Sequence, residues 1–188
     1  VTKTTYPNYK IVVVDNGSVD GSQEAVRHSF PDVVLIENGT NVGFGEGNNI
    51  GMRYALDLHA EWVLLLNNDV EVDGSMLTEM MNVALFDTAI GMIAPKIYYY
   101  DQPTQIWYAG GNINYWAGIV SHRGLREEDH GQYDSNEDTQ YLTGCALLIR
   151  SDVLKAVGFF DPIFSPAYGE DADLSVRATR AGFRLMYV

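Results

Sequence analysis

The stretch IVVVDNGS at residues 11–18 is an apolar, β-branched run that ends in turn-forming residues. The stretch WVLLLNND at residues 62–69 repeats this pattern, and residues 33–36 form a third apolar run between them. Such runs are typical of buried strands that are followed by turns. Helical patterns lie between the runs. Strands that alternate with helices predict an α/β domain with a mostly parallel sheet flanked by helices.

The predicted elements continue along the chain without a linker or an internal repeat. Helical patterns in the first half cover residues 22–30, 48–60 and 75–86, with a glycine-rich turn at 43–47. In the second half, the pattern predicts a strand over 91–100 that is broken by Pro95, a hairpin or wide loop over 107–120, and a polar, mobile segment over 125–138. A strand over 140–150, helices over 151–157 and 168–181, and a strand from 185 follow. We therefore expect a single domain over residues 1–188.

Composition limits the classes of function. The 188 residues are 46% hydrophobic, which is enough for the core of one domain. Twelve Lys and Arg against 25 Asp and Glu give a net charge of −13, which disfavours nucleic acid and anionic membrane surfaces as partners. Cys145 is the single cysteine, so a disulfide framework and a multi-cysteine zinc site are excluded, and a reducing, cytoplasmic compartment is expected.

Two aspartates follow predicted strands and are candidates for a ligand site. Asp15 ends the run at 11–14, and Asp69 ends the run at 62–66. In open α/β sheets, ligands bind outside the carboxyl ends of the strands. Asp69 is the one carboxylate in its segment, so it can share a magnesium or manganese ion with a diphosphate but cannot build a tight metal site alone. The alternative is that both segments are only turns, because Asn, Asp and Gly are common in turns.

The glycine-rich stretch GFGEGNNIG at residues 43–51 is a second candidate. It does not follow its strand directly, as a nicotinamide-binding motif would, so that interpretation is disfavoured. A close approach of glycine backbone to a phosphate or a sugar is favoured instead. The alternative is a plain loop that leads into a helix.

Three carboxylates open the last predicted helix, in the segment GEDAD at residues 169–173. Acidic residues at a helix N-terminus are common because the helix dipole favours them, and this is the structural interpretation. Asp173 and Arg177 are four residues apart and form an expected structural pair. Two adjacent acidic residues, Glu170 and Asp171, are more than the capping of a helix end requires, so one of them is a candidate general base.

Read together, these segments resemble the family 2 glycosyltransferases with the GT-A fold, especially the rhamnosyltransferase-like branch. The resemblance runs from about residue 6 to residue 188 and rests on several motifs in a fixed order. The motifs are VVVDNGS at 12–18 with DGS at 20–22, NVGFG at 41–45 with GNNIG at 47–51, LLLNNDV at 64–70, YLTGCALLIR at 141–150, GFFD at 158–161, YGEDADL at 168–174 and AGFR at 181–184.

The resemblance implies an inverting, metal-dependent hexosyltransferase that moves a sugar from a nucleotide-diphosphate sugar to an acceptor hydroxyl. Asp15 matches the position that reads the base, Asp69 the metal and diphosphate position of the D-x-D motif, and Asp171 the general base, with Glu170 as the second catalytic candidate. The other donor-binding candidates are Asn16, Gly43, Asn48, Asn67, which replaces the first acid of D-x-D, and Asn68. Residues 1–90 match the nucleotide-binding half and residues 91–188 the acceptor-side half.

The resemblance also implies more chain at both ends, including a first strand between the strands at 11–14 and 62–66. We expect the resulting gap in the sheet to be closed by strand rearrangement or by another copy of the chain, because unpaired strand edges drive association. The implied acceptor is a glycan or a lipid-linked glycan in polysaccharide or cell-surface glycan synthesis. The implied location is cytoplasmic and peripheral to the membrane.

Two other functions stay open from the sequence alone. One is a non-catalytic domain that binds a nucleotide sugar or a glycan. The other is a nucleotidyltransferase, which also needs an α/β sheet, a metal and phosphates. A nucleotidyltransferase is expected to carry an early glycine-rich loop with a basic phosphate clamp, whereas the first turn here, at residues 15–20, is acidic.

Overall fold

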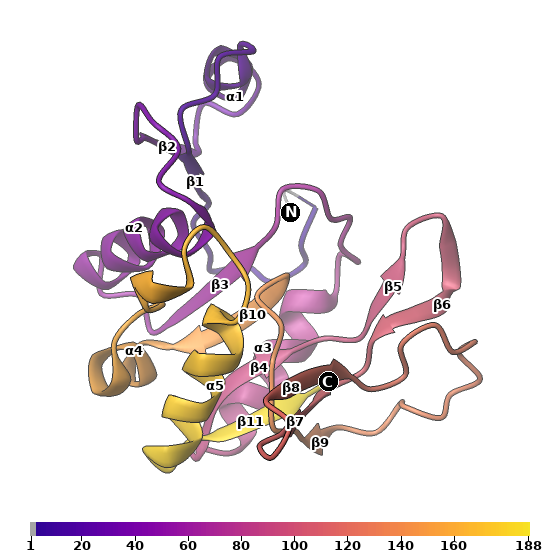
Figure 1. Ribbon diagram of the computed structural model, residues 1–188. Helices are drawn as coiled ribbons and strands as arrows, with labels where there is room; N and C mark the ends of the chain where they lie inside the picture. The colour runs from indigo at the N-terminus through magenta and orange to yellow at the C-terminus, as the bar shows by residue number, and fades with distance from the viewer. Residues whose placement is uncertain (1–2) are drawn as a thin grey trace.

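The computed structural model describes residues 3–188 and has helices on both faces of a central mixed sheet (Figure 1). The strands are β1 (Val12–Asp15), β2 (Val34–Glu37), β3 (Trp62–Leu66), β4 (Ile90–Ala94), β5 (Ile97–Tyr99), β6 (Gln102–Tyr108), β7 (Gly111–Asn114), β8 (Ile119–His122), β9 (Glu137–Asp138), β10 (Ala146–Arg150) and β11 (Arg184–Tyr187). The helices are α1 (Ser22–Ser29), α2 (Phe44–Asp57), α3 (Met76–Phe86), α4 (Ser151–Val157), the 3-10 helix η1 (Pro162–Phe164) and α5 (Glu170–Arg180).

The central sheet has the strand order β3-β10-β4-β11-β9. The α/β class with a sheet flanked by helices is confirmed: β3, β4 and β11 run in one direction, and two strands, β10 and β9, run against them. Strand β10 lies between β3 and β4 and is antiparallel to both, while β11 pairs in parallel with β4. The reason is that β10 returns from the second half of the chain and enters the sheet from the opposite end. An apolar run carries no sign of the direction in which its strand pairs, so the sequence pattern does not reveal the orientation of β10.

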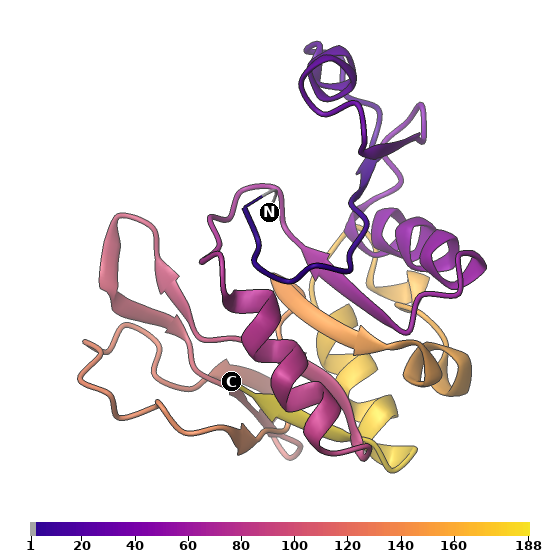
Figure 2. The same cartoon turned by 180° about the vertical axis from the view of Figure 1, so that it is seen from behind.

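Two helix layers cover the central sheet, and side chains alternate between them. Leu147 and Leu185 lie on the face that packs against α2, α4 and α5, whereas Leu148 and Met186 pack against α3. Figure 1 shows α4 and α5 in front of the sheet, and Figure 2 shows α3 on the opposite face. In residues 3–188, no helix has both the length and the apolar character that crossing a bilayer requires.

Strands β1 and β2 form a separate two-stranded parallel sheet, in which Val12 pairs with Val34 and Asp15 with Glu37. Together with α1, this unit extends away from the central sheet (Figures 1 and 2). Helix α2 contacts both β1 and β3, but these two strands do not pair with each other. The expectation that the chain closes this gap by rearranging its own strands is therefore wrong for the described residues. Closure by a second copy stays a prediction.

The second half differs from the predicted pattern in three places. Strand β10 begins only at Ala146, so residues 140–145 form a loop. The hairpin of β5 and β6 is stabilised by cross-strand pairs such as Tyr98 with Ile106, and its second strand was not predicted. The predicted mobile segment at 125–138 is instead attached to the sheet. The Nζ atom of Lys96 donates to Asp129 at 2.9 Å and to Asp134 at 2.6 Å.

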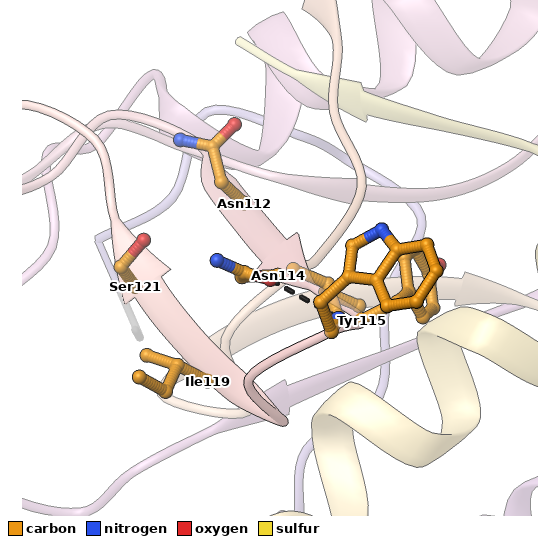
Figure 3. Close-up of a pocket in the computed structure, with 7 residues that line it drawn as sticks. Asn112, Asn114, Tyr115, Ile119 and Ser121 are labelled. Atoms are coloured by element: carbon orange, nitrogen blue, oxygen red, sulfur yellow. Dashed lines mark hydrogen bonds between the residues drawn. The ribbon is translucent and has the colours of Figure 1, made fainter.

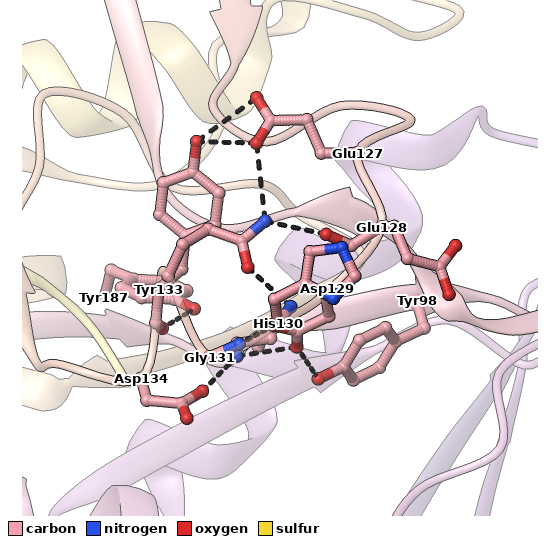
Figure 4. Close-up of polar contacts among 11 residues, drawn as sticks. Tyr98, Glu127, Glu128, Asp129, His130, Gly131, Tyr133, Asp134 and Tyr187 are labelled. Atoms are coloured by element: carbon pink, nitrogen blue, oxygen red, sulfur yellow. Dashed lines mark hydrogen bonds and ion pairs between the residues drawn. The ribbon is translucent and has the colours of Figure 1, made fainter.

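The ion pair between Lys96 and Asp129 is largely buried, unlike an ion pair at the surface. The side chains of Lys96 and Asp129 are only 13% and 12% exposed. The hydrogen bonds from Lys96 and Tyr98 lower the pKa of Asp129 to about 2. The Tyr187 hydroxyl also donates to the carbonyl of Tyr133 at 2.7 Å (Figure 4). These contacts join residues more than 30 positions apart. The polar local composition predicted a mobile loop because it does not reveal such long-range contacts, which hold the loop in place.

A buried amide joins α2 to the loop that follows α4. Asn49 is 2% exposed, its Nδ2 donates to the carbonyl of Phe160 at 2.9 Å, and its Oδ1 accepts from the N–H of Phe160 at 2.9 Å. Asn49→Ala leaves both backbone groups buried without partners. We expect it to lower the free energy of unfolding by about 2–4 kcal/mol in urea denaturation. Asn48→Ala is the control, because Asn48 donates only to Phe44 in its own helix. Equal losses for the two variants would contradict this role of Asn49.

Candidate functional site

Residues from both halves of the chain meet at the loop of Gly144 and Cys145. The N–H of Asn67 donates to the carbonyl of Cys145 at 3.0 Å, and the N–H of Gly144 donates to Oδ2 of Asp171 at 2.9 Å. Asp69 is close enough for its charge to add to burial, which raises the pKa of Cys145 to about 11. The segment that follows β3 and the start of α5 therefore both contact one short loop.

Asp171 lies in the first turn of α5, and three donors hold its carboxylate. Oδ2 accepts from the hydroxyl of Tyr141 at 3.0 Å and from Gly144, while Oδ1 accepts from the N–H of Ala172 at 2.8 Å. Leu174, three residues further on and on the same helical face, is fully buried. Asp171 itself is half-buried, so its carboxylate is oriented and still accessible.

Tyr141 is a site residue that sequence reasoning missed. It is 6% exposed, and burial followed by the charge of Asp171 raises its pKa, so it stays a hydroxyl donor. The ring of His122 stacks on Tyr141 with centroids 5.8 Å apart. His122 Nδ1 lies 3.1 Å from the carbonyl of Trp107, and burial lowers its pKa, which favours the neutral ring. Tyr141 stood inside a quoted motif, but only the contact with α5 reveals its role.

Glu170 lies beside Asp171 but in a different environment. It is 4% exposed, and its Oε2 has no hydrogen-bond partner among the described residues. Burial raises its pKa, and the charge of Asp171 adds to the effect. A side chain this buried cannot contact an acceptor directly, so Asp171 is the better placed of the two candidate bases. Asp173 pairs with Arg177 at 2.7 Å, which agrees with the structural role expected for it.

Asp15 organises the turn that follows β1. Its carboxylate accepts from the N–H of Gly17 at 3.0 Å, from the N–H of Ser18 at 3.1 Å and from Nε2 of Gln23 at 2.9 Å. Hydrogen bonds, led by that of the Ser18 side chain, lower the pKa of Asp15. The turn interpretation of this segment is therefore confirmed. Contact of Asp15 with a nucleotide base stays a prediction.

The glycine-rich stretch is the first turn of α2 rather than a separate turn. Gly43 has φ of 85°, and a Cβ at this position would lie 3.1 Å from the carbonyl oxygen of Pro166. The N–H of Phe44 donates to that same carbonyl at 3.0 Å. Asn16 donates to the carbonyl of Gly43 at 3.1 Å. The close approach that glycine permits here is thus to Pro166, and the donor-binding roles of Asn16, Gly43 and Asn48 stay predictions.

The side chains of Asn67, Asn68 and Asp69 differ from those described above, because they form no contacts of this kind within the described part of the chain. Asp69 and Asn68 are exposed, and across residues 3–188 none of the three side chains takes part in a hydrogen bond or ion pair. The described chain gathers no group of three or more His, Cys, Asp or Glu that would hold a metal by itself. One free carboxylate fits a divalent cation whose other ligands are diphosphate oxygens and water.

Comparison of the sequence with known proteins identifies the family to which this chain is similar. A sequence model of the family described as Glycosyl transferase family 2 matches residues 1–158. A low-salt glycan biosynthesis hexosyltransferase from Haloferax volcanii is 27% identical over 94% of this chain and 55% of its own length. An N-acetylglucosaminyl-diphospho-decaprenol L-rhamnosyltransferase from Mycobacterium tuberculosis is 26% identical over 95% of this chain and 63% of its own length. The chain thus spans a little over half of these relatives.

Solved structures agree on the fold, which is GT-A. GalNAc-T7, determined with UDP, GalNAc and Mn²⁺, superposes with a TM-score of 0.71 at 17% identity over 95% of this chain and 36% of its own. A mannosyltransferase from Pyrobaculum calidifontis, in complex with GDP-Man and Mn²⁺, superposes with a TM-score of 0.64 at 17% identity over 100% of this chain and 50% of its own.

Proposed function

Because this chain belongs to glycosyl transferase family 2, we propose that it forms the catalytic part of an inverting glycosyltransferase. The reaction transfers a hexosyl or deoxyhexosyl group from a nucleotide-diphosphate sugar to a hydroxyl of a glycan or lipid-linked glycan. The observation that carries the proposal is the loop of Gly144 and Cys145, which contacts both the segment of the unpaired Asp69 and the oriented Asp171.

Asp69 is the residue that would hold a divalent cation, magnesium or manganese. When bound, such an ion neutralises charge on the leaving diphosphate. The free carboxylate of Asp69 supports this assignment, as do the Mn²⁺ ions of the two superposed enzymes. Asn67 and Asn68 present neutral amides beside Asp69 and are assigned to the donor.

Asp171 is the proposed general base. An acceptor hydroxyl is a poor nucleophile until a base takes its proton. The hydroxyl oxygen attacks the anomeric carbon on the face opposite the diphosphate, the bond to the diphosphate breaks, and the configuration inverts. The acceptor proton goes to the carboxylate of Asp171. Tyr141 and Gly144 both hold Oδ2, so the carboxylate keeps one orientation during this transfer.

The arrangement of the chain follows from these assignments. Residues 1–90 would form the nucleotide-binding half and residues 91–188 the acceptor-side half of one domain. The free edges of β1 and β3 would favour pairing between copies of this chain. A cytoplasmic location, peripheral to the membrane that carries a lipid-linked acceptor, is part of the same proposal.

Titration of this chain with nucleoside diphosphates, with and without manganese, tests the proposed donor site. We expect saturable binding that requires the metal, because Asp69 alone supplies the protein carboxylate. Binding of neutral glycans with no affinity for any nucleoside diphosphate would contradict the proposal and favour a glycan-binding domain.

Tyr141 gives the proposed base a testable support. Tyr141→Phe removes one of the three hydrogen bonds that hold the carboxylate of Asp171. We expect kcat of the intact protein to fall about tenfold, the effect of losing one hydrogen bond to a charged group, while donor affinity stays the same.

Tyr108→Phe is the matched control for this measurement. Tyr108 is also buried, and its hydroxyl donates to the carbonyl of Tyr141 at 2.8 Å rather than to Asp171. Loss of packing or stability affects both variants, whereas a loss of kcat beyond that effect is expected only for Tyr141→Phe. Equal kcat values for the two variants would show that Tyr141 does not act on the base.

A further inference from the structure

The hairpin of β7 and β8 carries a hollow that lies outside the residues assigned above. Its volume is about 510 Å³, which is the size of many small-molecule sites (Figure 3). The lining residues come from both strands and from the turn that joins them. They are Asn112, Ile113, Asn114, Tyr115, Trp116, Ile119 and Ser121.

The register of the hairpin places polar groups on one face. Asn112 pairs with Ser121 and Asn114 pairs with Ile119, so these four side chains lie on the same, exposed face. Within residues 3–188, the side chains of Asn112 and Ser121 have no hydrogen-bond partner. The amide nitrogen of Asn114 has none in this range either. Figure 3 shows Asn112, Asn114, Ser121 and Ile119 extending from the two strands. This face therefore offers free amide and hydroxyl groups.

Two aromatic rings stand at the turn beside this face. Trp116 is 100% exposed and Tyr115 is 63% exposed. Hydrogen bonds order the turn itself, because Oδ1 of Asn114 accepts from the N–H groups of Trp116 and Ala117, both at 3.1 Å. Exposed apolar patches that are rimmed by polar residues mark interaction sites and ligand-binding grooves, whereas single exposed apolar residues do not.

The chemistry of the lining selects the class of ligand. No charged residue lines the hollow, although the chain as a whole has a net charge of −13. An anion finds no basic group here, and an anionic lipid surface is repelled by the rest of the chain. A neutral sugar fits, because its C–H face packs on an aromatic ring while its hydroxyl groups bond to amides and to Ser121.

The base of the hairpin connects the hollow to the proposed general base. Gly111 forms a bridge with Tyr141, and Tyr141 donates to Asp171. The N–H of Ile113 donates to Oε1 of Gln140 at 2.8 Å, which ties the hairpin to the same segment. The hairpin is therefore attached at its base to the residue that holds the proposed general base.

From this geometry we infer that the exposed face of the β7–β8 hairpin is a subsite for a neutral sugar residue of the acceptor glycan. The assignment of this sugar to the acceptor rests on the proposed function, whereas the sugar-binding chemistry rests on the hairpin alone. Trp116 and Tyr115 provide the stacking surface, and Asn112, Asn114 and Ser121 provide the hydrogen bonds.

A binding experiment tests the subsite without the reaction. The indole N–H signals of this chain are followed by NMR during titration with maltose, cellobiose and N,N′-diacetylchitobiose to saturating concentrations. We expect at least one of these neutral disaccharides to shift the signal of Trp116, identified by its loss in Trp116→Phe. The signals of Trp62 and Trp107 should stay in place. No shift with any of the three disaccharides, or a shift only with phosphatidylglycerol vesicles or with protein concentration, overturns the inference.

A kinetic experiment on the intact protein tests the link to the acceptor. We expect Trp116→Ala to raise the acceptor KM about tenfold, the effect of losing one good stacking contact, and to leave the donor KM unchanged. Phe86→Ala is the control, because Phe86 is 92% exposed at the end of α3. If disaccharides shift Trp116 but the chain binds no nucleoside diphosphate, the proposed function fails and the sugar site stands. An unchanged acceptor KM in Trp116→Ala overturns the acceptor subsite.

Discussion

Asp171→Asn in the intact protein is expected to lower kcat by about 10²–10⁴-fold while donor affinity stays the same. The amide cannot take the proton of the acceptor hydroxyl, but it keeps the size of the side chain and can still accept hydrogen bonds from Tyr141 and Gly144. Steady-state kinetics and nucleoside diphosphate titration of the same preparation measure both quantities.

Asp173→Asn and Glu170→Gln are the controls for this result. Asp173 lies in the same helical turn but pairs with Arg177, so its loss should affect stability more than turnover. Glu170 is buried beside the site. If Asp171→Asn turned over normally and Glu170→Gln were inactive, the base would be Glu170. If both variants were active, the catalytic role of this helix would be wrong.

Asp69→Ala is expected to abolish metal-dependent binding of nucleoside diphosphates. Asp69 supplies the one carboxylate of its segment, and its removal leaves only the neutral amides of Asn67 and Asn68 beside the diphosphate. Asn67→Ala should weaken binding less. Isothermal titration with and without manganese measures the effect. Glu71→Ala is the matched control, because it removes an exposed carboxylate from the same loop. Equal affinity for wild-type protein with excess chelator would contradict the role of the metal.

The parts of the fold that sequence predicted are those set by local pattern. The apolar runs at 11–14 and 62–66 became β1 and β3, Asp15 is the last residue of β1, and Asp69 lies in the loop after β3. The three-residue spacing of Asp171 and Leu174 puts both on one helical face, and Leu174 is fully buried in the core, whereas the catalytic role of Asp171 stays a prediction.

The parts that sequence did not predict depend on contacts between distant residues. Strand β10 reads as apolar in either direction, so its antiparallel insertion between β3 and β4 follows only from tertiary structure. The contact of Gly43 with Pro166 spans over a hundred residues and changes the interpretation of the glycine-rich stretch. Tyr141 resembles any core tyrosine until α5 brings Asp171 to its hydroxyl.

The most direct test of the proposed function is to identify the bond that breaks and the configuration that results. The intact protein is incubated with manganese, an acceptor glycan and a panel of nucleotide-diphosphate sugars, with water as the acceptor where no glycan reacts. NMR then follows the anomeric proton and the phosphorus signals. We predict release of a nucleoside diphosphate and a first-formed product with inverted anomeric configuration. A product with retained configuration, or release of pyrophosphate or a nucleoside monophosphate instead of the diphosphate, would contradict inverting glycosyl transfer with Asp171 as base.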